Sequence, residues 1–266
     1  MSGLRVYVEG VGLWSPQLAD FAALRSVLAG ETPAAPPPRP AAATLPANER
    51  RRAPASVLLA IEAAGQAVAM SGRDATTLAC VFASAHGDQP ITDYMCATLA
   101  HAPAELSPIR FHNSVHNAAV GYWTIATGCH APSTAIAAQA ASFGAGLLEA
   151  ASQVLADQCP VLLVCSDGDG SGPLAEVTGC TQAFGCALVL APAASAATQA
   201  RLDLQLAPPQ PEETLVEPLA GWRRDNPSAS SLALLALLAG AAGSAGSCRL
   251  AAAPALGLQI AMEKVA

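Results

Sequence analysis

Short runs of consecutive apolar residues alternate along most of this chain with longer segments whose apolar positions recur at helical spacing. The continuous runs predict buried strands over residues 4–12, 77–83, 133–137, 161–165 and 184–190. The helical spacing predicts helices over residues 18–28, 54–70, 91–99, 117–127 and 142–157. Because the strands do not alternate between apolar and polar positions, they are typical of a sheet that helices cover on both faces. We therefore expect an α/β fold.

The pattern weakens in the last third of the chain. There we expect a strand over 201–206 beside the strand 184–190, a helix over 228–238, and two short strands around residues 254–257. Loops are expected where Pro, Gly or polar residues gather, over residues 31–47, 107–116, 166–178 and 207–227.

Hydrophobic residues make up 52% of the chain and charged residues only 12%, which leaves few polar groups for the surface of a monomer. This composition favours an apolar interface with another subunit, although abundant alanine in a compact protein also dilutes charge. The net charge of −7 argues against nucleic acid or an anionic membrane as the partner. Basic groups within 49–52 and 223–224 are typical of solvated helix ends, and contact with an acidic carrier protein is a second interpretation.

Eight cysteines are scattered through the chain without CxxC spacing, and several of them lie inside apolar runs. They predict buried thiols in a reducing compartment, and we expect no disulfide, metal site or cofactor. The sequence begins with a predicted strand, without a signal peptide, and its longest apolar run near the end, residues 232–238, is too short to span a bilayer. These observations predict a soluble cytoplasmic protein without membrane insertion.

The segment over residues 129–156 combines a short strand, a turn of small residues and a helix. A strand that leads into a tight turn and a helix is the arrangement that lifts a catalytic nucleophile above a sheet. Here the turn holds Ala138, Gln139, Ala140 and Ala141, and none of these side chains can attack a carbonyl. The sequence therefore predicts the frame of a nucleophile turn without its nucleophile.

Other side chains are weaker candidates for chemistry. His112 and His116 are four residues apart, but no acidic residue nearby completes a metal set, so they are interpreted as ordering a loop. Cys165 ends a predicted strand, but no histidine follows it to activate the thiol. Ser171 lies in a stretch that lacks the G-x-S-x-G and GK[ST] patterns. A hydrolase or acyltransferase that uses Cys165, Ser171 or His86 remains an alternative.

The segment over residues 117–146 resembles the core of the β-ketoacyl synthases. Ala131-Pro132-Ser133 takes the place of that family's Gly-Pro-Ser turn, and residues 138–140 take the place of its Thr-Ala-Cys. The nucleophile position then holds Ala140, and a slip of one residue puts Gln139 there, as in the chain length factors of aromatic polyketide systems. With the strands 161–167 and 184–190, the resemblance covers residues 1–192. It implies a thiolase-like fold with a ketoacyl-synthase-like N-terminal domain over residues 1–192. The resemblance also implies a reduced C-terminal portion, a shortened segment over residues 193–266 that packs on the same domain.

The chain resembles in particular the shortened chain length factors of aryl polyene and xanthomonadin pigment clusters, through FHNSVHN at 111–117 and the GYW at 121–123. No histidine lies beyond residue 130, whereas the synthases carry two catalytic histidines after the cysteine. The resemblance implies a non-catalytic subunit. It would pair with a β-ketoacyl synthase that has an intact Cys-His-His site and form the acyl pocket with it, in aryl polyene, polyketide or fatty-acid-type biosynthesis. The subunit would contact acyl carrier protein as part of that complex.

Synthases of this superfamily pair through the strand just before the nucleophile turn, which implies a shared surface on this chain. The residues expected at this surface are His112, Asn113, His116, Asn117, Trp123, Gln139 and Phe143. The alternative is an independent protein that binds an acyl chain or a carrier protein without a synthase partner.

Overall fold

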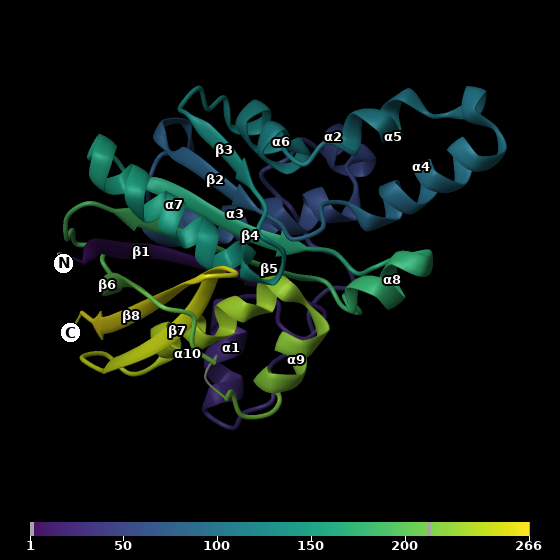
Figure 1. Cartoon of the computed structure of the whole chain (residues 1–266). Coiled ribbons are helices and arrows are strands. Elements are labelled where there is room, and N and C mark those ends of the chain that lie inside the picture. The colour runs from purple at the N-terminus through teal and green to yellow at the C-terminus, as the bar shows by residue number, and fades with distance from the viewer. Residues whose placement is uncertain (1–2, 212–213, 266) are drawn as a thin grey trace.

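The structure is a computed structural model that describes residues 3–211 and 214–265 of the chain. It contains an eight-stranded sheet in the order β3-β2-β4-β5-β1-β6-β8-β7 (Figure 1). The strands are β1 (Leu4–Trp14), β2 (Ala79–Ala83), β3 (Ser133–Ile136), β4 (Val161–Asp167), β5 (Phe184–Ala191), β6 (Ala200–Ala207), β7 (Ala245–Ala253) and β8 (Leu256–Lys264). Strands β2, β3 and β4 are parallel to one another, and the other neighbouring strands pair antiparallel.

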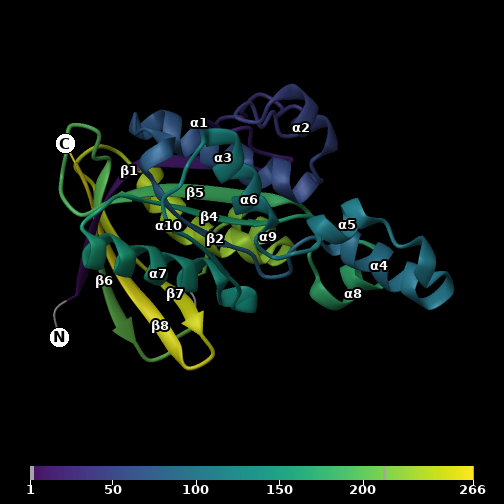
Figure 2. The ribbon, with the colours of Figure 1, turned by 90° about the horizontal axis from the view of Figure 1, so that it is seen from above.

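Helices lie on both sides of the central strands (Figures 1 and 2). The helices are α1 (Phe21–Leu28), α2 (Ala47–Arg52), α3 (Ala55–Ser71), α4 (Gln89–His101), α5 (Pro108–Asn113), α6 (Ala118–Thr127), α7 (Ser142–Asp157), α8 (Gly172–Thr178), α9 (Leu219–Asp225) and α10 (Leu232–Ala239). Helices α3 and α6 form one apolar core with one face of the sheet, and α1, α7 and α10 form the other core with the opposite face. This architecture confirms the predicted α/β, thiolase-like fold class.

Helix α3 packs directly on strand β1, because small residues line both surfaces. A side chain at Gly12 would place its Cβ 1.9 Å from the carbonyl oxygen of Ala63, and one at Gly10 would come within 2.0 Å of that of Ala67. No Cβ fits at such distances, so these glycines set the spacing between helix and sheet. The short apolar run at the start of the chain thus becomes a central strand that is buried on both faces.

The order of the strands corrects one prediction. Strand β5 was expected beside β6, but β1 lies between them and pairs with both. Because the first strand of the chain inserts between β5 and β6, these two strands are neighbours in sequence but not in the sheet. The two strands of the tail are longer than predicted, with nine residues each in β7 and β8.

Strands β6, β8 and β7 bury one face and expose the other, because buried and exposed residues alternate along them. The sheet bends there, so that its last strand, β7, reaches helix α7 (Figure 2). A Cβ at Gly144 of α7 would lie 2.1 Å from the carbonyl oxygen of Ala251, which shows how closely helix and strand approach. Residues 200–264 therefore extend the same sheet, and the boundary near residue 192 stays a prediction.

A short helix, α2, begins at the end of the loop expected over 31–47, and further short helices form where loops were expected, α5 in 107–116, α8 in 166–178 and α9 in 207–227. Two residues of the last of these loops, 212–213, lie outside the described residues. Each short helix has six or seven residues, below the length at which helical spacing becomes visible in a sequence. Within the described ranges, no helix combines the length and the apolar character needed to cross a membrane.

Candidate functional site

The carboxyl ends of the parallel strands β2, β3 and β4 meet at one edge of the sheet, where α/β proteins commonly bind their ligands. Asp167 ends β4 and is 1% exposed. Its carboxylate accepts hydrogen bonds from the Ser84 hydroxyl at 2.8 Å, the backbone N–H of His86 at 3.0 Å and the Ser228 hydroxyl at 2.5 Å. This buried carboxylate fixes the loop after β2 against the last third of the chain.

The turn between β3 and α7 has the geometry of a nucleophile turn. Gln139 has a φ of 51°, a left-handed conformation that costs energy for a residue with a side chain. The hydroxyl of Ser142 accepts from the backbone N–H of Ala138 at 2.9 Å and donates to the carbonyl oxygen of Gln139 at 2.7 Å, which holds the turn closed. Gln139 and Ala140 are exposed. The backbone singles out Gln139, the residue of the slipped alignment, as the most strained point of the turn.

The hydroxyl and thiol groups of two candidate nucleophiles are buried. Ser142 is 1% exposed and both of its hydrogen bonds close the turn. Cys165 is fully buried, and burial, followed by electrostatic interaction with the neighbouring Cys186 thiol and the Asp167 carboxylate, raises the pKa of its thiol well above the usual range. Ser171 lies 3.4 Å from the Asp93 carboxylate. In the described part of the chain, no hydrogen bond joins a histidine to Cys165 or to Ser171.

Four of the predicted site residues lie in one segment, at the end of α5 and the start of α6. Nε2 of His116 lies 3.1 Å from the carbonyl oxygen of Ser84, which connects this segment to the loop after β2. Asn113 is buried and accepts from the Tyr122 hydroxyl at 3.3 Å. His112 and Asn117 are exposed. Among residues 3–211 and 214–265 no three His, Cys, Asp or Glu side chains come together as a metal site.

The structure corrects the expectation that Trp123 and Phe143 lie at a surface. Each is 1% exposed, and the two belong to different cores on opposite faces of the sheet. Both lie on helices in which apolar residues occur on several sides, so the spacing alone does not tell which of them face outward. Of the seven predicted residues, His112, His116, Asn117 and Gln139 are exposed, and Asn113 is buried in the same segment as His112, His116 and Asn117.

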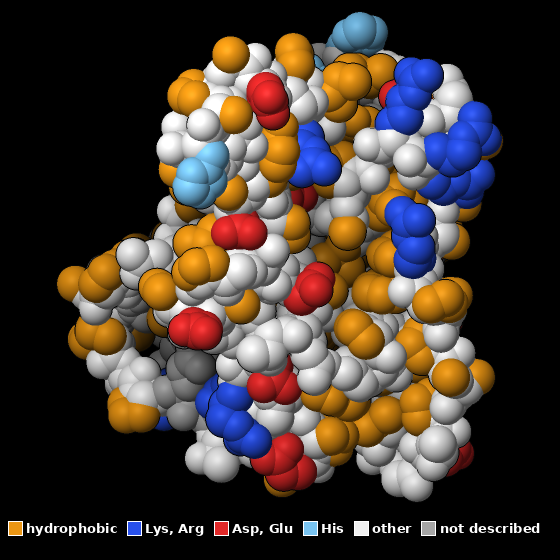
Figure 3. Space-filling view, turned by 90° about the vertical axis from the view of Figure 1, so that its right-hand side faces the viewer, with side chains coloured by type: hydrophobic (Ala, Val, Ile, Leu, Met, Phe, Trp, Pro, Cys, Tyr) orange, Lys and Arg blue, Asp and Glu red, His pale blue; other side chains and the backbone are white. Residues whose placement is uncertain are grey.

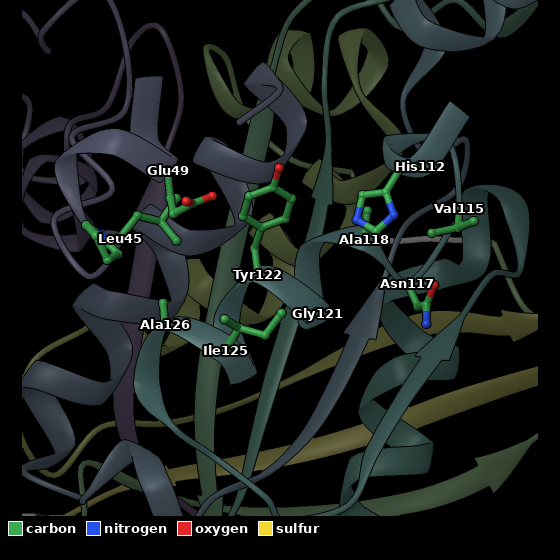
Figure 4. Close-up of a pocket in the computed structure, with 11 residues that line it drawn as sticks. Leu45, Glu49, His112, Val115, Asn117, Ala118, Gly121, Tyr122, Ile125 and Ala126 are labelled. Carbon is green, nitrogen blue, oxygen red and sulfur yellow. The ribbon is translucent and has the colours of Figure 1, made fainter. Parts of the chain in front are cut away.

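An apolar groove of about 460 Å³ runs between helices α2 and α6 and the end of α5 (Figure 4). Its wall includes Leu45, Val115, Tyr122 and Ile125, and His112 and Glu49 also line it. Ile125 is 84% exposed and Val115 is 48% exposed, which is unusual for apolar side chains of their size beside a cavity. Ile125, Val115 and Tyr122 were not among the residues predicted for a site. The sequence did carry a signal for Ile125 and Tyr122, because helix 117–127 is apolar around most of its circumference and must therefore show apolar side chains to the outside.

Strand β3 forms one edge of the sheet and pairs only with β2 among the described strands. Ser133, Ala135 and Ala137 are exposed along its open edge. The strand carries no charge, no proline and no bulge within residues 133–136, which are the devices that protect a free edge from pairing with another chain. The edge therefore offers unpaired backbone groups for a further strand.

The family description "β-ketoacyl synthase, N-terminal domain" matches residues 26–249, most of the chain. The chain belongs to this family. No curated protein sequence matches it.

Solved ketosynthase structures share the fold. A chain of the ketosynthase (ApeO) in complex with its chain length factor (ApeC) from Xenorhabdus doucetiae is 23% identical, with a TM-score of 0.71 over 97% of this chain and 99% of that chain. A chain of the ishigamide ketosynthase/chain length factor is 13% identical, with a TM-score of 0.75 over 99% and 100%. A chain of AntDE:AntF, a type II polyketide synthase carrier protein in complex with its ketosynthase, is 18% identical, with a TM-score of 0.59 over 72% and 63%.

Proposed function

We propose that this protein is a non-catalytic ketosynthase-like subunit, a chain length factor, that pairs with an active β-ketoacyl synthase and forms part of its acyl pocket. One observation carries the proposal. The strained turn after β3 presents Gln139 and Ala140 where a synthase of this fold needs a nucleophile, and the same turn follows an unprotected edge strand.

A condensing enzyme needs a thiolate to hold the acyl chain and donors to stabilise the developing oxyanion. The exposed part of the turn offers an amide and methyl groups instead. Cys165, the thiol considered as an alternative nucleophile, is fully buried, and its pKa is raised by burial. No histidine lies beyond residue 130 to take the part of the family's two catalytic histidines. These features support a subunit that shapes a reaction carried out by its partner.

Pairing would use the open edge of β3. The carbonyl oxygens of Pro132 and Ile136 accept from β2, at Cys80 and Ser84, so the backbone groups of Ser133, Ala135 and Ala137 point to the open side. A strand of the partner added there would continue the sheet across both subunits and bring Gln139 to the border between them. His112, His116 and Asn117 would lie beside that border, with Asn113 behind them and with Trp123 and Phe143 supporting it from the two cores.

The similar structures support the same arrangement. Two of them are described as complexes of a ketosynthase with a chain length factor, and a third includes an acyl carrier protein. On this basis we assign the chain to aryl polyene, polyketide or fatty-acid-type biosynthesis in the cytoplasm, with a ketosynthase that has an intact Cys-His-His site as its partner. The subunit then contacts acyl carrier protein as part of the complex.

The test is co-expression of the full chain with a cysteine-bearing synthase encoded near it, followed by mass measurement of the native complex. We expect a stable pair, and substitution of the partner's cysteine should abolish acyl loading while the pair persists. Ala135→Pro removes an outward-pointing N–H and should weaken the pair, whereas Ala135→Ser keeps that N–H and should not.

Two outcomes would reject the proposal. One is a chain that alone becomes acylated and elongates a malonyl thioester, which would mark it as an enzyme. The other is a stable monomer that ignores the synthase yet binds an acyl chain or a carrier protein by itself, which would mark it as an independent binding protein.

A further inference from the structure

Strand β3 is covered on one face of the sheet and open on the other. On the covered face, Gln153 of α7 donates to the Thr134 hydroxyl at 3.1 Å, and Ile136 packs against the core that includes α7. Ser133 and Ala135 point to the opposite face, in register with buried residues of β2 that belong to the core of α3 and α6, and they are exposed. The face of β3 that is turned away from α7 therefore leaves two small side chains uncovered.

The edge of β3 is too small to hold two proteins together by itself. A stable interface takes about 20–30 residues from each partner, whereas the edge offers residues 133–137. A protein that pairs with β3 must therefore also contact residues on at least one side of the strand. On one side lies the outer surface of α7, and on the other lies the α5–α6 segment, residues 108–127, whose helix α6 packs on β2 next to β3.

The α5–α6 segment exposes large apolar side chains. Phe111 is 56% exposed, and Ile109, Val115 and Ile125 are also exposed. These four are among eleven large hydrophobic side chains that are exposed in the described part of the chain, and all four fall between residues 109 and 125. Figure 3 views the end of the molecule that carries α4 and α5, and hydrophobic side chains reach the surface across its upper part. Apolar surface gathered in this way marks a site of protein contact.

The outer surface of helix α7 has the opposite character. Its exposed residues are Ser152, Ala156 and Asp157. Among the described residues, none of the exposed large hydrophobic side chains lies on this helix. The core of a protein interface is rich in aromatic residues and poor in Asp, Ser and Ala. Of the two surfaces beside β3, the α5–α6 segment is therefore the one that suits a partner.

We infer that the synthase partner covers the α5–α6 segment together with the edge of β3 and leaves the outer surface of α7 in water. The inference rests on the proposed function for the identity of the partner. Phe111 is the expected anchor, because buried aromatic side chains contribute most to the affinity of an interface. Val115 and Ile125 add aliphatic contact. The matching surface of the synthase is apolar and includes a hollow that accepts an aromatic ring.

The test uses the full chain and the synthase encoded near it. Phe111→Ser should weaken pairing by about tenfold or more, the effect of removing an anchor residue from an interface. Leu206→Ser is the matched control, because Leu206 is 54% exposed and lies on β6, with four strands between it and β3. It should leave the affinity unchanged. Titration calorimetry measures the affinities, and circular dichroism shows whether both variants are folded.

Ala156→Arg tests the other side of the strand. Because Ala156 is exposed on α7, a long charged side chain there should leave pairing unchanged if α7 stays in water. Pairing of Phe111→Ser that is as tight as that of the unchanged chain would overturn the inference, and so would loss of pairing in Ala156→Arg. Either result leaves the proposed function standing, since the unchanged chain still pairs. Absence of any complex with the unchanged chain would reject the proposed function and this inference with it.

Discussion

The hydroxyl of Ser142 donates to the carbonyl oxygen of Gln139 at 2.7 Å, across the turn that joins β3 to α7. The same hydroxyl accepts from the N–H of Ala138, so one side chain closes both sides of the turn. Because Gln139 adopts a left-handed conformation, the backbone of the turn is strained, and the two hydrogen bonds of Ser142 stabilise it in this conformation. The exposed position of the Gln139 side chain thus depends on a residue that is itself buried.

Ser142→Ala should destabilise the protein by about 1 kcal/mol, the usual contribution of a buried hydrogen bond, and should loosen the turn. Denaturant unfolding followed by circular dichroism measures the free energy. Ser152→Ala is the matched control, because the Ser152 hydroxyl donates to a backbone carbonyl at the same 2.7 Å, on the exposed face of the same helix. We expect Ser152→Ala to change the stability much less. Equal losses for both variants would show that the turn does not depend on the bridge.

Ile125→Glu tests the role of the groove between α2 and α6 in pairing. Ile125 is 84% exposed, so a glutamate there should leave the stability of the isolated chain unchanged, while desolvation of its charge should weaken a complex tenfold or more. Val177→Glu on α8 is the matched control, since Val177 is 83% exposed and lies outside the groove lining. Affinity for the synthase partner, measured by titration calorimetry, should fall only for Ile125→Glu. An unchanged affinity would exclude this groove from the interface.

The buried thiols should make the protein sensitive to alkaline pH. Burial raises the pKa of Cys186 from 9.0 to about 12. At a pH between these two pKa values, the Cys186 thiol keeps its proton in the folded chain and loses it in the unfolded chain. Stability is therefore complete below pH 9.0 and falls as the pH rises toward 12, by about 1 kcal/mol per pH unit for each such thiol.

Cys186→Ala should remove the contribution of one proton to the slope of unfolding free energy against pH, as measured by urea unfolding between about pH 9 and 10.5. The exposed Cys96 is the control, and Cys96→Ala should leave the slope unchanged. An identical slope for Cys186→Ala and the unchanged chain would mean that this thiol does not hold its proton on folding.

Hydrophobic patterning was sufficient to predict the fold class and most central elements, because strands such as β4 are buried on both faces and show it in sequence. It failed for the neighbours of β5, since no local pattern reports that the first strand of the chain inserts beside the fifth. Patterning also failed to separate the buried Trp123 from the exposed Ile125, two positions along the same apolar helix. In both cases the missing information concerned contacts between elements that are far apart in the sequence.

The residue types predicted which reactive groups the candidate site lacks, but they did not predict the geometry of the site as well. The lack of a nucleophile in 138–141 follows from residue types alone. Spacing left both Gln139 and Ala140 as candidates for the nucleophile position, and the left-handed backbone of Gln139 is a property of the folded turn that spacing does not contain.

The free edge of β3 also bears on how the chain behaves at high concentration. Residues 133–136 are uncharged and leave a row of backbone groups unpaired, so the same strand of a second copy can bond to them in register. Self-association through this edge would compete with any other strand that adds there, so we expect the chain purified alone to aggregate more readily as its concentration rises.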